Sequence, residues 1–253
     1  MLGFQPAIYQ KPRDAFKFAK EHGFYHVEFL MDNPLYSLEK LSPAEVLEMK
    51  ECYEVDVILH APATSTNFLS VSEVMRKASY EELLRVMRFA DKCDAKLITF
   101  HVGWNPGFIT AKGFVFPKEL YREHNYEVLT KEMYNFLKRV DAEVLALENT
   151  IPLDETLSKA VEFLIENTEL SLTFDVGHYF CKGNHDVFLR HFERVRNVHI
   201  HDNDLKSDLH LALGEGKVDL NVIPKDYNGY MTIECRDVEA ILKSKEFVER
   251  WRS

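Results

Sequence analysis

The segment NVHIHDNDLKSDLHLALGEG, residues 197–216, contains three histidines and three aspartates. Imidazole and carboxylate groups bind divalent cations, and a set without thiolates suits Zn, Mn, Co or Mg better than a soft metal. His199 and His201 are two residues apart, so on a strand their side chains point to the same face. We expect one of them to be a metal ligand and the other to contact the substrate or orient a ligand. The alternative interpretation is a polar surface loop.

Further imidazole and carboxyl groups stand where other short apolar runs end, as His101 does after LITF and Glu148 does in LALE. A single histidine or glutamate in such a position is more often a hydrogen-bonded structural residue or a helix cap. Several carboxylates at one place would repel one another and shift their pKa values unless a cation lay between them. We therefore predict a metal site. Its candidate residues are His60, His101, Glu148, Asp175, His178, His199, Asp208, His210 and Glu234.

Eight short apolar runs alternate with segments of helical pattern and would position these side chains. The runs are LGFQPAI, YHVEFLM, VDVILHAP, AKLITFHVGW, AEVLALENT, LSLTFDVGH, NVHIHDND and YMTIECRD. Helical patterns cover residues 12–23, 42–53, 71–93, about 118–140, 153–168 and 185–195, and a helical tail ends the chain. Ser42, Pro43 and Glu45 together are typical of a helix start, with a capping side chain, a proline at the first helical position and a glutamate at the third.

The runs near Leu97, Val144, Leu172 and Met231 are apolar almost throughout, which is typical of parallel strands buried on both faces. Eight strand–helix units without a low-complexity linker predict a single α/β domain over residues 1–253, folded as a (β/α)8 barrel. The active site of such a barrel lies at the C-terminal ends of its strands, where the candidate residues would meet. An open doubly wound sheet is the alternative, but no glycine-rich phosphate loop follows the first run.

The motifs LHAP, FHVG, LEN, FDVGH, VHIHDND, DLHLALGEG and TIEC follow one another at these predicted strand ends. In this order they resemble the xylose-isomerase-like TIM barrel superfamily, which includes metal-dependent sugar and sugar-phosphate isomerases and epimerases. It also includes endonuclease IV, the AP endonuclease family 2 that cleaves DNA at abasic sites. The resemblance extends from about Ile58 to Cys235, and is looser in the first two strands, where Glu28 stands in a VEF segment common in the group.

The resemblance to the epimerase branch implies one metal ion and four ligands. The matching positions are Glu148, Asp175, His199 and Glu234. The metal polarises a carbonyl and its neighbouring hydroxyl, which acidifies the adjacent C–H bond. Glu148 and Glu234 would then act as the acid/base pair, one removing a proton and the other returning one. His178 matches a histidine that contacts the substrate in these enzymes.

The resemblance to the endonuclease IV branch implies three zinc ions and a larger ligand set. The matching positions are His60, His101, Glu148, Asp175, His178, His199, Asp208, His210 and Glu234, and all nine carry the expected residue type. Many sugar-isomerase relatives also keep the LGEG segment and the two early histidines, so the match does not separate the two branches. Asp208 and His210 are the positions at which a one-metal isomerase and a three-metal nuclease would differ.

The charge of the chain favours a small substrate over DNA. Its 31 basic and 41 acidic residues give a formal charge of −10, and the loops after His60 and Glu148 contain no basic residue. DNA binding needs basic side chains around the site. Basic residues of the remaining loops are scattered: Lys112, Lys182, Lys206 and Arg236. They suffice for one phosphate group, although each is more often a solvated surface charge.

The leading hypothesis is therefore a divalent-metal-dependent isomerase or epimerase of a small sugar or sugar phosphate, with one ion expected and up to three accommodated. The alternative is an endonuclease IV-like zinc phosphodiesterase, which would bind nucleic acid. Expected substrate contacts are His60, His101, His178, His201, Lys206 and Arg236. Four separated cysteines and the lack of a signal peptide or membrane span predict a cytoplasmic protein with no membrane partner. Relatives include dimers and tetramers, so a homo-oligomer is compatible with the sequence.

Overall fold

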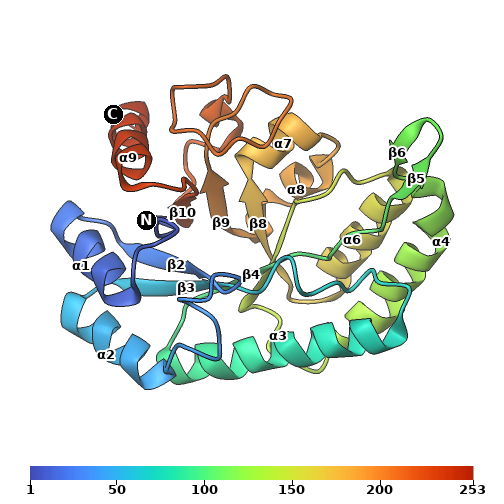
Figure 1. The fold of residues 1–253 in the computed structure, drawn as a ribbon, viewed down its shortest axis with the longest axis horizontal. Coiled ribbons are helices and arrows are strands. Elements are labelled where there is room, and N and C mark those ends of the chain that lie inside the picture. The colour runs from blue at the N-terminus through green and yellow to red at the C-terminus, as the bar shows by residue number, and fades with distance from the viewer. Residues whose placement is uncertain (253) are drawn as a thin grey trace.

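The computed structural model describes residues 1–252, apart from the side chain of Lys182, and Ser253 lies outside the described part. Eight parallel strands form a closed barrel in the order β1-β10-β9-β8-β7-β4-β3-β2 (Figure 1). Their bounds are β1 Leu2–Phe4, β2 His26–Leu30, β3 Asp56–His60, β4 Ile98–Phe100, β7 Leu145–Glu148, β8 Ser171–Asp175, β9 Val195–Ile200 and β10 Tyr230–Ile233. Each strand coincides with or overlaps one of the eight predicted runs, so the (β/α)8 barrel is confirmed.

Helices connect the strands and cover the outside of the barrel (Figure 1). They are α1 Pro12–His22, α2 Pro43–Tyr53, α3 Glu73–Cys93, α4 Lys118–Glu127, α5 Tyr134–Leu137, α6 Glu155–Asn167, α7 Val176–Lys182, α8 Asp186–Arg190 and α9 Val238–Arg252. α2 begins with Pro43 after Ser42, as predicted, but the Ser42 side chain makes no capping hydrogen bond. The capping part of that prediction is wrong, and proline with its fixed φ is the feature that begins the helix.

The connection between β4 and α6 differs from the sequence prediction. The helix expected at about residues 118–140 is α4 and α5 joined by a π-helical segment, Val128–Met133. Before it, β5 (Phe108–Thr110) and β6 (Gly113–Val115) form an antiparallel hairpin that projects from the body of the molecule (Figure 1). Gly113 has a φ of 104°, and Thr110 donates a side-chain hydrogen bond to its carbonyl.

The barrel strands are buried on both faces, and the apolar core surrounds them. Within residues 1–252, no helix combines the length and apolar character that crossing a membrane requires. In contrast to the apolar core, the C-terminal ends of the strands carry many buried polar residues, and these residues form the candidate site.

Candidate metal centre

The C-terminal ends of the barrel strands surround a cavity of about 350 Å³. Three clusters of ligand-type side chains lie there, in each of which the candidate ligand atoms lie within 4.8 Å of one another, and a fourth such group is formed by Glu28, His60 and His199. The central cluster is Glu148, Asp175, His199 and Glu234. The β9-loop cluster is His178, His201, Asp208 and His210. The β3–β4 cluster is His60, His101 and Glu148.

The central cluster comes from the ends of β7, β8, β9 and β10. His199 Nδ1 lies 3.5 Å from Glu234 Oε2, 3.6 Å from Glu148 Oε2 and 3.9 Å from Asp175 Oδ2. His199 Nδ1, Asp175 Oδ2 and Glu234 Oε2 are buried and have no hydrogen-bond partner among the described residues. Buried polar atoms are normally paired, so lone pairs converging in this way fit a cation. The donor set, one imidazole and three carboxylates, suits Zn, Mn, Co or Mg.

Glu28 orients the imidazole of His199 from beneath the cluster. His199 Nε2 donates to the Glu28 carboxylate at 2.9 Å, and Asn197 Nδ2 and Thr232 Oγ1 donate to it at 2.8 and 3.1 Å. Burial opposes ionisation of Glu28, but the nearby His199 outweighs it and lowers the pKa to about 2. A carboxylate bound to one imidazole nitrogen directs the other nitrogen at a metal. In the sequence, Glu28 stands out only as part of the VEF segment, and no role is predicted for it. The feature that could have indicated a role is a charged residue inside the otherwise apolar run VEFL.

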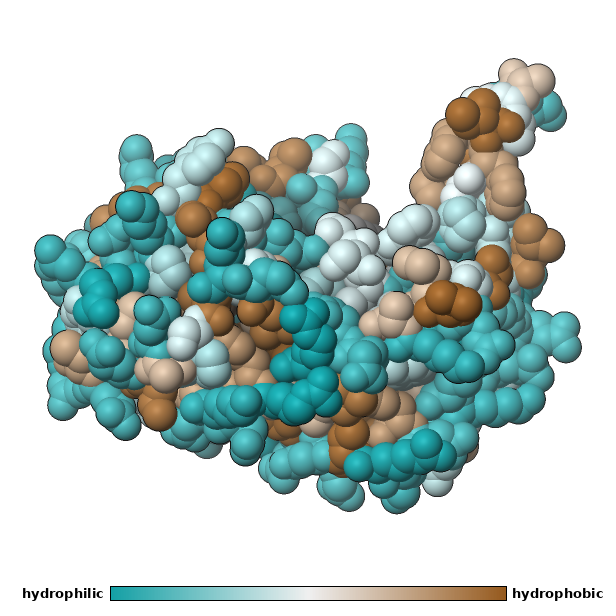
Figure 2. All heavy atoms as spheres, turned by 60° about the horizontal axis from the view of Figure 1, so that its bottom comes forward, coloured by the Kyte–Doolittle hydropathy of each residue, from teal (hydrophilic) through white to brown (hydrophobic). Residues whose placement is uncertain are grey.

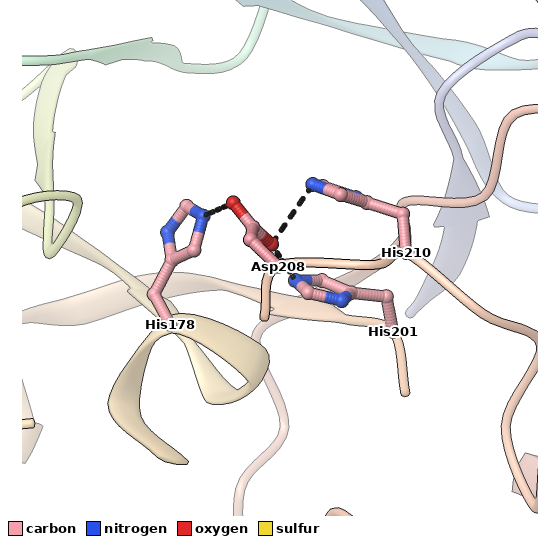
Figure 3. Close-up of side chains that lie close together, drawn as sticks. All are labelled: His178, His201, Asp208 and His210. Carbon is pink, nitrogen blue, oxygen red and sulfur yellow. Dashed lines mark hydrogen bonds and ion pairs between the residues drawn. The ribbon is translucent and has the colours of Figure 1, made fainter. Parts of the chain in front are cut away.

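The β9-loop cluster is built around Asp208, which points between two histidines (Figure 3). His178 Nε2 lies 3.0 Å from Asp208 Oδ2, and His210 Nε2 lies 3.2 Å from Oδ1. His201 Nε2 lies 3.7 Å from Asp208 Oδ1, and its ring stacks on that of His210 at 4.0 Å between centroids. The structure thus places His201 in this cluster and His199 in the central one, so the two neighbouring histidines serve different clusters.

Asp202 holds the loop that carries this cluster. Its Oδ2 accepts hydrogen bonds from the backbone N–H groups of Gly214 and Gly216, and its Oδ1 accepts one from Val218, all at 2.9 Å. Gly216 packs against the Asn203 backbone so closely that a Cβ would lie 2.3 Å from its carbonyl oxygen. The loop course is therefore fixed by one buried carboxylate and one glycine, which positions Asp208 and His210 over the strand ends.

Glu148 joins the three clusters. Its Oε2 accepts hydrogen bonds from His60 Nε2 at 3.1 Å and from His101 Nε2 at 3.0 Å. Its Oε1 lies 3.2 Å from Nδ1 of His178. One buried carboxylate therefore contacts imidazoles of the β3–β4 and β9-loop clusters and is itself a member of the central cluster.

The electrostatics of these buried groups favour a cation. Burial disfavours the imidazolium form of His178 and His199, but the surrounding carboxylates outweigh it and hold both pKa values well above the ordinary one. Burial also opposes ionisation of Glu148, and the charges of His101 and His199 nevertheless lower its pKa well below its usual range. His101 differs, because burial is its dominant influence and lowers its pKa. The carboxylates thus need positive charge, from protonated imidazoles or from a metal.

Of the two basic residues predicted to contact the substrate, one lies in the cavity wall. Arg236 lines the cavity and donates to Gln5 Oε1 at 3.1 Å. Lys206 lies on the exposed part of the β9 loop and is not among the residues lining the cavity. Lys112 is exposed in the turn of the β5–β6 hairpin, and the side chain of Lys182 lies outside the described part of the structure.

Comparison with known sequences settles the family. Residues 16–251 match the family described as the xylose isomerase-like TIM barrel. The chain belongs to this family. The uncharacterized protein MJ1614 of Methanocaldococcus jannaschii is 31% identical over 195 residues, which cover 76% of this chain and 74% of that protein. Fructoselysine 3-epimerase of Escherichia coli O157:H7 is 22% identical over 261 residues, which cover 94% of this chain and 92% of the enzyme.

Solved structures share the same fold. A D-tagatose 3-epimerase-like protein superposes with a TM-score of 0.77 at 22% identity, covering 99% of this chain and 96% of its own. Endonuclease IV from Thermus thermophilus gives 0.70 at 20% identity, with 99% and 98% covered. IOLI protein with a binding zinc atom gives 0.73 at 16% identity, with 100% and 98% covered. The neighbours thus include epimerase-like and nuclease members of one fold.

Proposed function

We propose that this protein is a divalent-metal-dependent isomerase or epimerase of a small sugar or sugar phosphate. The observation that carries the proposal is the central cluster, in which three buried atoms without a hydrogen-bond partner among the described residues converge beside Glu148: His199 Nδ1, Asp175 Oδ2 and Glu234 Oε2. The similarity to fructoselysine 3-epimerase along 94% of the chain supports the reaction class. The expected ligands are Glu148, Asp175, His199 and Glu234.

A metal at this cluster, when bound, supplies Lewis-acid polarisation of the substrate carbonyl and hydroxyl oxygens. Glu148 ends β7 and Glu234 follows β10, and in the barrel β8 and β9 lie between these two strands. The two carboxylates therefore approach the cluster from different sides. One carboxylate accepts the proton of the activated C–H bond, and the other returns a proton to the opposite face or to the next carbon. His178, His210 and Arg236 line the cavity and would orient the sugar hydroxyls or a phosphate.

Isotope exchange tests this reaction without knowledge of the natural sugar. The Mn- or Co-loaded protein is incubated with a panel of ketoses tritiated at the exchangeable carbon, and both release of tritium to water and epimer formation are measured. We expect Glu234→Gln to abolish both and the exposed Glu239→Gln to retain both. Absence of exchange from every sugar with the wild-type protein would overturn the proposal.

A second candidate function is a three-metal phosphodiesterase acting on abasic DNA. The specific observation in its favour is that all nine matching residues form three clusters joined at Glu148. The charge of −10 and the single arginine in the cavity wall favour a small substrate instead.

Elemental analysis of the purified protein separates the two candidates. A value near one metal ion per chain, retained even after equilibration with excess zinc, contradicts the phosphodiesterase. A value near three, together with chelator-sensitive cleavage of a duplex containing an abasic site, would reverse the order of the two proposals.

A further inference from the structure

A second cavity, of about 310 Å³, lies beside the metal cavity. We call it the side cavity. Its lining comes from the loops after β4 and β7 and from the starts of α4 and α6: Trp104, Asn105, Pro106, Phe116, Pro117, Lys118, Tyr121, Asn125, Ile151, Pro152, Asp154 and Leu157. Two of these residues, Trp104 and Ile151, also line the metal cavity. The two cavities are therefore neighbours with a shared wall, at the end of the barrel where substrates bind.

The shared wall is tied to the candidate ligands by the chain itself. Trp104 follows His101 by three residues, and Ile151 follows Glu148 by three residues. The residues of the shared wall are therefore only three positions along the chain from candidate ligands, so a ligand held at the central cluster would lie close to the side cavity. This short connection favours one ligand that occupies both spaces over two unrelated ligands.

The side cavity favours an apolar occupant because the amide and carboxylate side chains of its wall are already paired within the protein. Asn105 and Asn125 exchange two amide hydrogen bonds, at 3.1 and 2.7 Å. Asp154 accepts from Arg122 Nε at 3.0 Å and from the backbone N–H of Leu157 at 2.9 Å. A sugar hydroxyl placed against these groups would compete with existing bonds, whereas a ring or alkyl group would not.

Two large aromatic side chains of the lining are exposed to solvent. Trp104 is 51% exposed and Phe116 is 63% exposed. Figure 2 shows hydrophobic residues gathered on the arm that projects from the molecule, formed by the β5–β6 hairpin that precedes Phe116. Exposed apolar groups beside a polar cavity are typical of a binding site for a ligand with both characters.

We propose that the side cavity binds an aromatic or bulky apolar group carried by the substrate, so that the substrate is a sugar conjugate that keeps a free carbonyl, such as a ketose that carries an aryl group. The proposal rests on the proposed function, because it assumes that the sugar part lies at the central cluster. An apolar cavity of about 150 Å³ accommodates benzene, so a cavity of about 310 Å³ has room for a substituted ring.

Calorimetric binding tests the proposal without requiring turnover. The metal-loaded protein is titrated with phenyl β-D-glucopyranoside, methyl β-D-glucopyranoside and phenol. We expect the phenyl glucoside to bind about 10- to 100-fold more tightly than the methyl glucoside, because a buried ring contributes as much as a buried phenylalanine side chain. It should also bind more tightly than phenol, because its sugar and ring occupy both cavities.

Two matched variants localise the effect. Phe116→Ala should weaken binding of the phenyl glucoside about tenfold and leave that of the methyl glucoside unchanged. Ile109→Ala changes a residue of the adjacent β5–β6 hairpin that is 87% exposed and outside the cavity lining, and this variant should bind both glucosides as the wild type does. Metal content and thermal unfolding of both variants verify that the fold is retained.

Equal affinity for the two glucosides, binding of neither, or binding of phenol as tight as that of the phenyl glucoside would each overturn the proposal. So would sedimentation showing a dimer that Phe116→Ala dissociates, because a second copy would then cover the side cavity. Failure of the proposed function is distinguishable. In that case no isotope exchange would be observed, but the protein would still prefer the phenyl glucoside to the methyl glucoside. Failure of the present inference would abolish that preference and leave the exchange.

Discussion

Replacing Glu28 by glutamine tests whether a residue buried beneath the central cluster tunes its metal affinity. The Glu28 carboxylate accepts hydrogen bonds from His199 Nε2, Asn197 Nδ2 and Thr232 Oγ1 at 2.8–3.1 Å. Glutamine offers one acceptor oxygen in place of two and turns an N–H₂ group toward these donors. We expect zinc affinity to fall about 10- to 100-fold, the usual effect of losing such a carboxylate, which corresponds to about 1.4–2.8 kcal/mol.

The assay is competition for zinc against a chromophoric chelator at pH 7, with thermal unfolding measured on the same samples. Glu143→Gln is the matched control, because this exposed glutamate pairs with Arg196 on the surface and should leave zinc affinity unchanged. Wild-type zinc affinity in a folded Glu28→Gln variant would refute the reasoning. Loss of one whole equivalent of zinc, without weaker binding of the rest, would instead identify Glu28 as a direct ligand.

Three further predictions concern protons, the β9 loop and packing. The pKa values of His178 and His199 are held well above the ordinary one, so metal binding at pH 7 must expel protons from these imidazoles. The heat of metal binding measured by calorimetry should therefore depend on the ionisation enthalpy of the buffer. The apparent metal affinity should rise with pH until both imidazoles are neutral. Asp202→Ala leaves four backbone N–H groups without their acceptor, those of Asn203, Gly214, Gly216 and Val218, and should lower the urea-derived free energy of unfolding by about 2–4 kcal/mol. A loss below about 0.5 kcal/mol would contradict its anchoring role. In Gly177→Ala the new Cβ would lie 2.1 Å from the buried His201 ring, so the free energy of unfolding should fall by about 1–3 kcal/mol, and an unchanged midpoint would show that the ring moves freely.

The barrel and the gathering of its polar residues could be predicted from the sequence because both depend on chain periodicity. Strand ends of a (β/α)8 barrel occupy one rim, so a ligand-type residue that ends an apolar run is placed without knowledge of any contact. Glu148 and Asp175 are such residues, and the structure brings them within reach of His199. Their role as ligands stays a prediction.

Features that depend on side-chain contacts or loop courses could not be predicted in the same way. Glu28 is identified only when β2 and β9 are seen to face each other across the barrel interior, where Glu28 meets His199. The β5–β6 hairpin has two three-residue strands, too short for alternation to be distinguished from loop. The side cavity is formed by loops whose courses periodicity does not determine.

The sharing of Glu148 has a consequence for the order in which ions would enter the site. The Glu148 carboxylate contributes negative potential to all three clusters, so the first cation to bind in one cluster reduces the negative potential at the other two. Cations in adjacent positions would also repel each other across a few ångströms. Metal binding should therefore be anticooperative. The central cluster should bind an ion first, and the other clusters should follow only at higher metal concentration. The number of ions carried in a cell would then depend on the free metal level there, and with it the chemistry that the site performs.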